Sequence, residues 1–293
     1  MVRIVKKKIG NNDFYYLRHH TKDKEKEVYL GKKIPDNIEE IKKEFLMQFY
    51  RNDWLSKIKE ISTGYKKYKK KVPKTVLQKQ IEDFAVIFTY NTQKIEGSTL
   101  TLQETTNLLL YGITPATKPK DHMVETEMHK KIFDEMLYHK NKISLATVLY
   151  WHKAMFDKTK PDIAGKIRDY HVRVGQSKTE FPDPNVIPLM LKEFFRWYNK
   201  NKKILNPAEL AARAHLRFVS IHPFGDGNGR VSRLIMNKIL DEFGYPMLDV
   251  EYGKRVMYYS ALEKSQITDN DFYFVRWFMS RYIKAHHDFY HNV

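Results

Sequence analysis

Apolar side chains recur at helical spacing along most of the chain after residue 73, which predicts a mainly helical fold. The interval from residue 206 to residue 244 shows this best. Asn206 followed by Pro207 is typical of a helix start, and Gly244 is typical of a helix end. Between these limits the pattern predicts two helices, each with one apolar face. The faces consist of Ala211, Ala214, Phe218 and Ile221 in the first helix and Val231, Leu234, Ile235 and Ile239 in the second. Pro223 disfavours helical torsions in the residue before it and therefore separates the two helices by a short loop.

Similar patterns predict other helices at residues 74–95, 101–110, 121–139, 144–157, 186–198, 255–262 and 271–283. The first 35 residues instead have strand-like segments at 2–9, 14–17 and 27–30, with Gly10 in a turn, before a helix that starts near Asp36. Between Gly165 and Pro184, Val172 and Val174 alternate with polar residues, which predicts an isolated β-hairpin. The predicted fold is a helical bundle with a β-hairpin flap, preceded by a small basic module of a sheet and a helix.

Charge divides the chain in the same way. The net charge is +17, and residues 1–71 hold 20 Lys and Arg against 10 Asp and Glu. A lysine run before Pro73 suggests a hinge, so we expect domains at 1–71 and 72–293. The first domain has two interpretations, which stay open: a module that binds a target, an acidic partner or nucleic acid, or a solvated appendage that improves solubility or forms a homodimer.

Composition also excludes several classes of protein. The chain has no cysteine, so disulfide frameworks, thiolate nucleophiles and cysteine metal sites are excluded. The first residues lack the apolar run of a signal peptide, and no run of about 18 apolar residues suggests a membrane span. We therefore expect a cytoplasmic protein without a membrane partner.

The loop from His222 to Arg230 concentrates the candidate chemistry. Its glycines and the start of the following helix present free N–H groups, which form a cradle for phosphate. Arg230 adds a planar fork for phosphate oxygens, and Asp226 can hold a divalent ion. His222 can take a proton near neutral pH. Together these groups predict attack on a phosphate ester.

Other glycine-rich motifs fit this loop poorly. The Gly-Lys-Ser/Thr end of a Walker A loop is missing, and both flanks are helical, unlike those of a dinucleotide-binding fingerprint. Asp226 to Asn228 is similar to the start of a calcium loop, but Arg230 stands where the next oxygen ligand belongs.

His222 to Arg230 matches the Fic motif His-Pro-Phe-x-Asp/Glu-Gly-Asn-Gly-Arg at every fixed position, and Arg233 matches the second arginine of its longer form. The chain thus resembles the Fic (Fido) family from about Glu82 to its last helices, with a Fido core at about 144–283. The resemblance implies a protein adenylyltransferase (AMPylase), a nucleotidyltransferase that uses Mg-ATP and moves AMP to a Ser, Thr or Tyr hydroxyl of a target protein. A related phosphate-transferring subgroup has lysine where Gly229 stands, so the resemblance favours AMP transfer.

The resemblance also implies roles for individual residues. His222 is the base, Asp226 holds Mg²⁺, and Phe224 anchors the loop. The α-phosphate is bound by Gly227, Asn228 and Gly229, the β- and γ-phosphates by Arg230 and Arg233, and the rest of the nucleotide by Val172, Arg173, Val174, Gly175, Tyr258, Tyr259 and Gln266. The flap would hold a segment of the target protein by strand addition.

A second motif implies autoinhibition. Residues 74–97 are expected to form a helix that ends in Thr92-Gln93-Lys94-Ile95-Glu96-Gly97, similar to the family's inhibitory motif Ser/Thr-x-x-x-Glu-Gly/Asn. A glutamate at a helix C-terminus opposes the helix dipole, so a cation is expected to compensate it. By resemblance Glu96 pairs with Arg230 and keeps the γ-phosphate from its productive place. In some family members this glutamate also aligns a water that removes AMP.

Two alternatives to AMP transfer stay open. One is a nucleic-acid-associated regulator that works through residues 1–71. The other is a Fic enzyme that uses another phosphate-containing donor, for example a CDP-alcohol.

Overall fold

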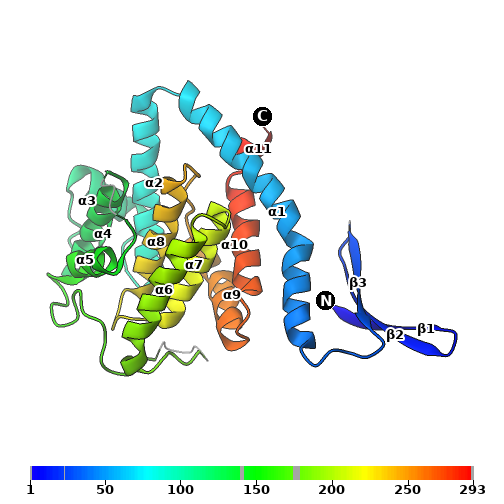
Figure 1. Cartoon of the computed structure of the whole chain (residues 1–293). Coiled ribbons are helices and arrows are strands. Elements are labelled where there is room, and N and C mark those ends of the chain that lie inside the picture. The colour runs from blue at the N-terminus through cyan, green and yellow to red at the C-terminus, as the bar shows by residue number, and fades with distance from the viewer. Residues whose placement is uncertain (1, 23, 139–141, 174–178, 292–293) are drawn as a thin grey trace. The chain divides into compact units, whose positions relative to one another are not determined.

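The computed structural model describes residues 2–22, 24–138, 142–173 and 179–291 (Figure 1). The chain forms two compact units, residues 1–57 and 58–293. The division falls inside the long helix α1 (Ile38–Lys71). The domain boundary expected near residue 71, between domains 1–71 and 72–293, stays a prediction.

The first unit is the predicted module of a sheet and a helix. Its antiparallel sheet has the order β1 (Arg3–Ile9), β2 (Asn12–His20), β3 (Glu25–Gly31), with Leu17 opposite both Ile4 and Val28. Leu17 is buried, and the His19 ring packs on Phe49 of α1 and hydrogen-bonds to Tyr50 at 3.0 Å. The end of β2 therefore packs on the helix through His19.

The second unit is helical in the described residues, as predicted. Its helices after α1 are α2 (Lys74–Ile95), α3 (Leu102–Tyr111), α4 (Lys120–Tyr138), α5 (Leu145–Phe156), α6 (Ile187–Asn201), α7 (Pro207–Ile221), α8 (Asn228–Glu242), α9 (Arg255–Ile267), α10 (Phe272–Ala285) and α11 (His287–His291). Short 3-10 turns stand at Pro184–Val186 and Tyr252–Lys254. None of the helices in the described ranges is long and apolar enough to cross a membrane.

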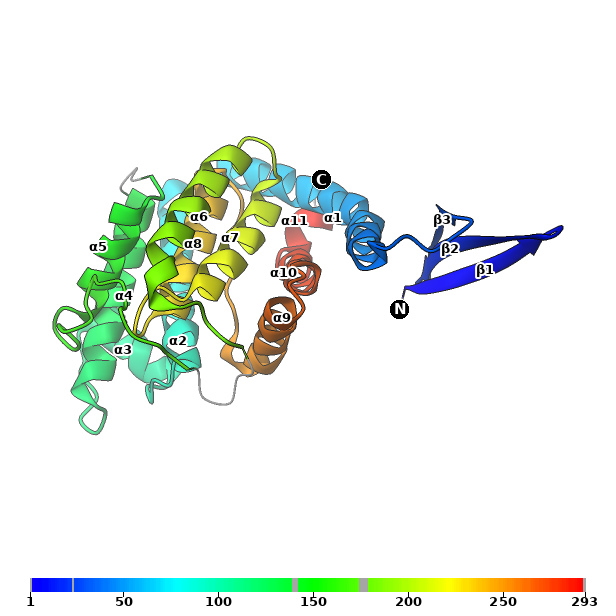
Figure 2. The same cartoon turned by 60° about the horizontal axis from the view of Figure 1, so that its bottom comes forward.

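Helices α7 and α8 form the centre of this unit (Figures 1 and 2). Helix α7 packs against α8, α6 and α10, while α2 and α4 pack together and each contacts α8. The eight apolar positions predicted for α7 and α8 are all buried. Ala211 and Ala214 have small side chains, which let the two helices lie close together. The loop between α7 and α8 is therefore held at both ends by the core.

The segment between residues 165 and 184 differs from the prediction. Its described parts, 165–173 and 179–184, contain no strand before the 3-10 turn, and the remainder, including Val174 and Gly175, lies outside the described residues. Buried Arg168 donates to the carbonyl oxygens of Tyr170 at 2.7 Å and Pro182 at 2.8 Å. One guanidinium thus joins both sides of the segment, where the prediction had a strand ladder.

Candidate functional site: the α7–α8 loop and its neighbours

The loop between α7 and α8 turns sharply at both ends. His222 closes α7 with a left-handed backbone (φ 50°, ψ 57°), unusual for a residue with a Cβ. Gly227 precedes α8 with φ 79°, and a Cβ there would collide with the Phe156 ring. Only glycine fits that position without strain. The first N–H groups of α8 consequently follow directly on a tightly packed loop.

Phe224 and Asn228 hold the loop together from inside. Phe224 is buried and stacks on the His152 ring, with centroids 3.8 Å apart. The Asn228 amide donates to the Phe224 carbonyl at 2.9 Å and accepts from the Phe224 N–H at 2.9 Å. Phe224 thus lies where the sequence predicted. Asn228, predicted to bind phosphate, uses its side-chain amide oxygen and one amide N–H to shape the loop.

His152 ties the loop to α5 and to the segment after it. Its Nδ1 accepts from the Gly165 N–H at 2.9 Å, so its Nε2 donates to the Asp226 carbonyl at 3.0 Å. Burial lowers the pKa of His152 to about 4, which keeps the ring neutral at pH 7. This role could not be predicted from the sequence, because His152 has no motif spacing to the loop.

His222 is oriented as a proton acceptor. Its Nδ1 lies 3.2 Å from the Val219 carbonyl and must donate to it, which assigns the ring proton to Nδ1 and the lone pair to Nε2. The Phe181 ring packs on the imidazole, with centroids 3.9 Å apart. Arg168 donates to the His222 carbonyl at 2.8 Å. Burial lowers the pKa of His222 to about 4, so the imidazole is neutral and can accept a proton at pH 7.

Asp226 and Arg230 form a cluster of four charged side chains with Lys160 and Glu125. Asp226 pairs with Arg230 at 2.8 Å through Oδ1 and with Lys160 at 2.7 Å through Oδ2. Glu125 of α4 pairs with both cations, at 2.9 Å in the case of Lys160. Burial alone would raise the pKa of the Asp226 carboxyl, but Arg230 and Lys160 outweigh it and hold that pKa well below its usual range. Asp226 is therefore a stable carboxylate at neutral pH.

The partner of Glu96 corrects one prediction. Glu96 caps α2 and pairs with Arg233 at 2.5 Å, whereas the family resemblance implied a pair with Arg230. The reason is that Arg230 is already engaged by Asp226 and Glu125. Arg233 lies about one helical turn further along α8 and is directed to α2.

Thr92 and Tyr258 complete the surroundings of Arg233. The guanidinium donates to the Thr92 hydroxyl at 3.3 Å, the Thr92 carbonyl at 3.4 Å and the Tyr258 hydroxyl at 3.3 Å. A Cβ on Gly229 would collide with the Glu96 carboxylate, so glycine is also what admits Glu96 to this place. The last turn of α2, with Gly97 beyond it, thus lies directly against the start of α8.

The residues predicted to bind the rest of the nucleotide divide into two groups. Tyr258 is buried behind Arg233 and also hydrogen-bonds to His215 at 3.1 Å, so it belongs to the core. Tyr259 is partly exposed and donates to the Ile95 carbonyl at 3.3 Å, beside Glu96. Gln266 accepts from Thr179 at 3.1 Å and donates to Ser220 at 3.1 Å. It thus joins α9 to α7 and to the segment between residues 165 and 184, called the flap segment below.

The remaining predicted positions are only partly described. Val172 is half-buried and Arg173 is exposed. Val174 and Gly175 lie outside the described residues. The structure brings together His222, Asp226, Gly227 to Arg230, Arg233 and Glu96 around one loop.

Asp226 is the residue that fits a divalent cation. The described ranges contain no group of three His, Asp or Glu side chains with the geometry of a metal site. Magnesium is commonly held by one or two carboxylates together with substrate phosphates, so one ionised carboxylate beside a phosphate cradle fits it.

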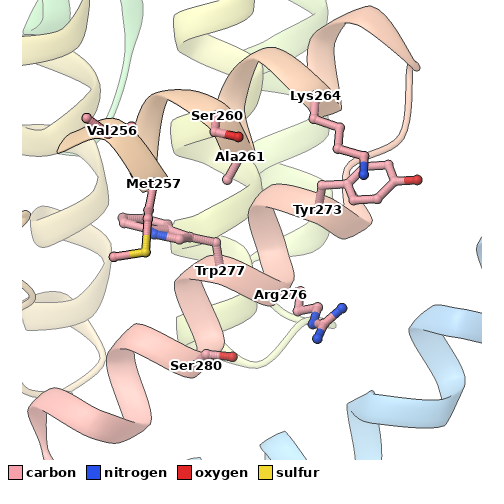
Figure 3. Close-up of a pocket in the computed structure, with 9 residues that line it drawn as sticks. All are labelled: Val256, Met257, Ser260, Ala261, Lys264, Tyr273, Arg276, Trp277 and Ser280. Atoms are coloured by element: carbon pink, nitrogen blue, oxygen red, sulfur yellow. The ribbon is translucent and has the colours of Figure 1, made fainter. Parts of the chain in front are cut away.

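A separate surface pocket lies between α9 and α10 (Figure 3). Val256, Met257 and Trp277 form its apolar part, and Lys264 and Arg276 are the cations that line it. None of the predicted site residues lines it.

Known proteins match this chain over a region that includes the same loop. The family model described as Fic/DOC family matches residues 142–240. Protein adenylyltransferase Fic of Drosophila ananassae is 34% identical over 178 residues, covering 59% of this chain and 35% of that protein. Protein adenylyltransferase fic-1 of Caenorhabditis elegans is 30% identical over 201 residues, covering 67% and 39%. The chain thus spans little more than a third of the length of these curated relatives.

Solved structures agree on the fold. A Fic domain containing signaling protein from Bacteroides thetaiotaomicron superposes with a TM-score of 0.72 at 25% identity, covering 80% of this chain and 95% of that one. Residues 134–508 of C. elegans Fic-1 give a TM-score of 0.67 at 26% identity, covering 80% and 70%. The loop from His222 to Arg230 thus lies between two central helices of a Fic-like fold, inside the segment 142–240 that matches the Fic/DOC family.

Proposed function

We propose that this chain is a protein adenylyltransferase that moves AMP from ATP to a Ser, Thr or Tyr hydroxyl of a target protein. The observation that carries the proposal is the orientation of His222, whose Nε2 is left to accept a proton at the mouth of a glycine-rich loop. The curated relatives named protein adenylyltransferase support the same activity.

The reaction needs one base and a phosphate cradle. His222 Nε2 takes the proton of the target hydroxyl as its oxygen forms a bond to the α-phosphorus. The bond from the α-phosphorus to the bridging oxygen breaks, and pyrophosphate leaves. A base so placed contributes about 10²–10⁴ in rate. The Gly229 N–H stands at the start of α8, where the helix dipole favours the charge that grows on the α-phosphate. The Gly227 N–H, also predicted to bind this phosphate, donates to Asp226 Oδ1.

The cations of α8 would bind the leaving group. Arg233 carries a planar fork that suits the γ-phosphate. Arg230, held between Asp226 and Glu125, would add positive charge near the β-phosphate. Asp226 would hold Mg²⁺, which supplies positive charge to the phosphate oxygens when bound. The buried stack of Phe224 on His152 would hold the loop, and with it these side chains, in a fixed position.

Glu96 would restrain this activity. Its carboxylate takes the Arg233 fork that the γ-phosphate needs, so ATP would bind with its α-phosphate out of line. A misplacement of about 1 Å can cost on the order of 10² in rate. The same carboxylate could align a water for removal of AMP. Docking of the target on the flap segment and a cytoplasmic location remain predictions, as do a homodimer and the two roles weighed for residues 1–71.

The test is incorporation of label from α-labelled ATP into proteins of a cell lysate and into the chain itself. We expect His222→Ala to abolish incorporation while ATP still shifts the melting temperature, because the phosphate cradle remains. His20→Ala, a change of an exposed histidine in the first unit, serves as the matched control. Self-modification of His222→Ala at the wild-type rate would refute the assignment of the base.

A further inference from the structure

Asp226, Arg230, Glu125 and Lys160 form a closed ring in which the charges alternate in sign. The Asp226 carboxylate bridges Arg230 (2.8 Å) and Lys160 (2.7 Å). The Glu125 carboxylate bridges the same two cations from the opposite side. Two carboxylates and two cations leave the ring neutral, and every charge has two partners.

The ring has a buried half and an open half. Glu125 and Arg230 retain only 7% and 3% of their side-chain exposure, whereas Lys160 and Asp226 retain 35% and 37%. The pair in the interior is fixed, since separating buried charges is costly. The Lys160–Asp226 pair can be reached from solvent and can exchange partners.

The two oxygens of Asp226 are not equivalent. Oδ1 accepts from Arg230 and from the Gly227 N–H at 2.5 Å, so it belongs to the folded loop. Oδ2 accepts from Lys160 at 2.7 Å. A cation that approaches Asp226 from solvent therefore meets Oδ2 and the ammonium group already on it.

We propose that Lys160 is an exchangeable counter-ion of Asp226, which must release Oδ2 when a divalent cation binds there. This inference deepens the proposed function, in which Asp226 is the metal ligand. It assigns to Lys160 a positioning role for which the Fic motif gives no signal, because the lysine lies 62 positions before the motif begins.

Lys160 has a second partner to which it can retreat. Its Nζ lies 2.9 Å from Glu125 Oε1, and its stem is flexible. After the exchange Asp226 would pair with the metal and Arg230, while Lys160 would pair with Glu125 alone. No charge is then left buried without a partner, so the exchange avoids the penalty of an uncompensated ion. Lys160 would act as a competitor that raises the metal concentration needed for occupancy.

The test is a titration of the full chain with Mn²⁺, followed by electron paramagnetic resonance of the free ion, without nucleotide. Lys160→Met removes the ammonium group and keeps an unbranched side chain of similar length. We expect it to bind Mn²⁺ about tenfold more tightly than wild type, the size expected for one partly screened charge pair. Lys160→Arg keeps the competing charge, so it should bind no more tightly than wild type.

Two further variants locate the effect. Lys158→Met removes an exposed lysine two residues away and controls for the change in net charge. Asp226→Asn in the Lys160→Met background should abolish the gain. The rise in melting temperature on adding Mn²⁺ should follow the same order, since a bound ion stabilises the fold.

Equal gains in Lys158→Met and Lys160→Met would overturn the proposal, as would a gain that survives Asp226→Asn, or Lys160→Met binding no tighter than wild type. Transfer of AMP plays no part in this readout. A chain that gains affinity for Mn²⁺ but transfers no AMP would therefore refute the proposed function and keep this inference.

Discussion

The two arginines of α8 in the Fic loop region, Arg230 and Arg233, are three residues apart and both buried, yet their surroundings differ. Arg230 pairs with two carboxylates, Asp226 and Glu125. Arg233 pairs with Glu96 and otherwise donates to uncharged oxygens of Thr92 and Tyr258.

We therefore expect Arg230 to have a structural role and Arg233 a regulatory one. The charge of Arg230 is balanced on α4 and on its own loop, so it contributes to the architecture of the site. The carboxylate that balances Arg233 comes from the end of α2 and keeps 22% of its exposure. A partner at a helix terminus can leave without disturbing the core, and it would leave behind a buried cation that attracts an anion such as phosphate.

The largest expected effect comes from removing the arginines. Arg230→Met should lower the free energy of unfolding by about 3–5 kcal/mol, because Glu125 stays buried with half of its positive partners gone. Arg233→Met should cost less, about 1–3 kcal/mol, because Glu96 can turn to water. Urea unfolding at pH 7 measures both. Equal losses would contradict the distinction between the two arginines.

The next effect concerns the rate of AMP transfer. Glu96→Gly should raise it on the order of 10²-fold at saturating Mg-ATP, because the Arg233 fork becomes free for the γ-phosphate. The gain should exceed any change in ATP affinity. Removal of AMP should weaken.

Glu96→Gln provides the graded control for this prediction. Its amide fills the same space without the full charge, so the rate should rise less than in Glu96→Gly. Initial rates of label incorporation decide the point. Unchanged rates in both variants would make Glu96 a structural carboxylate only.

Acid should lower the free energy of unfolding through two buried histidines, His129 and His215, whose pKa values the arginines of α8 help to lower. Burial, with Arg233 and Arg230 adding to it, lowers the pKa of His129 to about 3, and burial with Arg233 holds that of His215 well below its usual range. An unfolded histidine has a pKa near 6.5, so below that pH the unfolded chain binds protons that the folded chain excludes. Stability should therefore fall as the pH drops from about 6.5 towards 4, by up to about 1.4 kcal/mol per pH unit for each histidine.

Urea unfolding at several pH values measures that slope, and His129→Gln serves as the comparison. The variant should lose part of the pH dependence. A slope as steep as that of wild type would show that His129 does not contribute.

The smallest effect tests the uncharged side of Arg233. Tyr258→Phe removes a hydroxyl that lies 3.3 Å from Arg233 and 3.1 Å from His215. We expect a loss of about 0.5–1.5 kcal/mol in unfolding free energy, the usual size for hydrogen bonds of this kind. ATP affinity should change little, because Tyr258 is buried behind the guanidinium. A large loss of ATP affinity with unchanged stability would instead support the predicted role of Tyr258 in nucleotide binding.

Local signals explain what could be predicted from sequence. Helical periodicity identified α7 and α8, and Pro223 marked the loop, because these features depend on neighbours in the chain. The helix predicted at 101–110 is α3 in the structure, and its start has an equally local signal, the capping box of Thr101 and Glu104. The three strands of the first unit followed from alternation and turn residues.

Partners distant in sequence could not be predicted in this way. Glu125 and Lys160 reach the loop from other elements, and Arg168 joins two sides of a segment whose alternating pattern suggested a hairpin. The pairing of Glu96 with Arg233 could not be predicted either, because it depends on the two carboxylates that already pair with Arg230. Which cation remains for a partner is decided by the three-dimensional packing.

Gly229 has an evolutionary consequence. Glycine and alanine codons differ by one base, and a methyl group at this position would collide with the Glu96 carboxylate. A single point mutation could therefore displace the Glu96 carboxylate from Arg233 while leaving α2 and its motif intact. The restraint proposed for Glu96 would then be lost without any change in Glu96 itself, so we expect selection on regulation as well as on catalysis to keep glycine at this position.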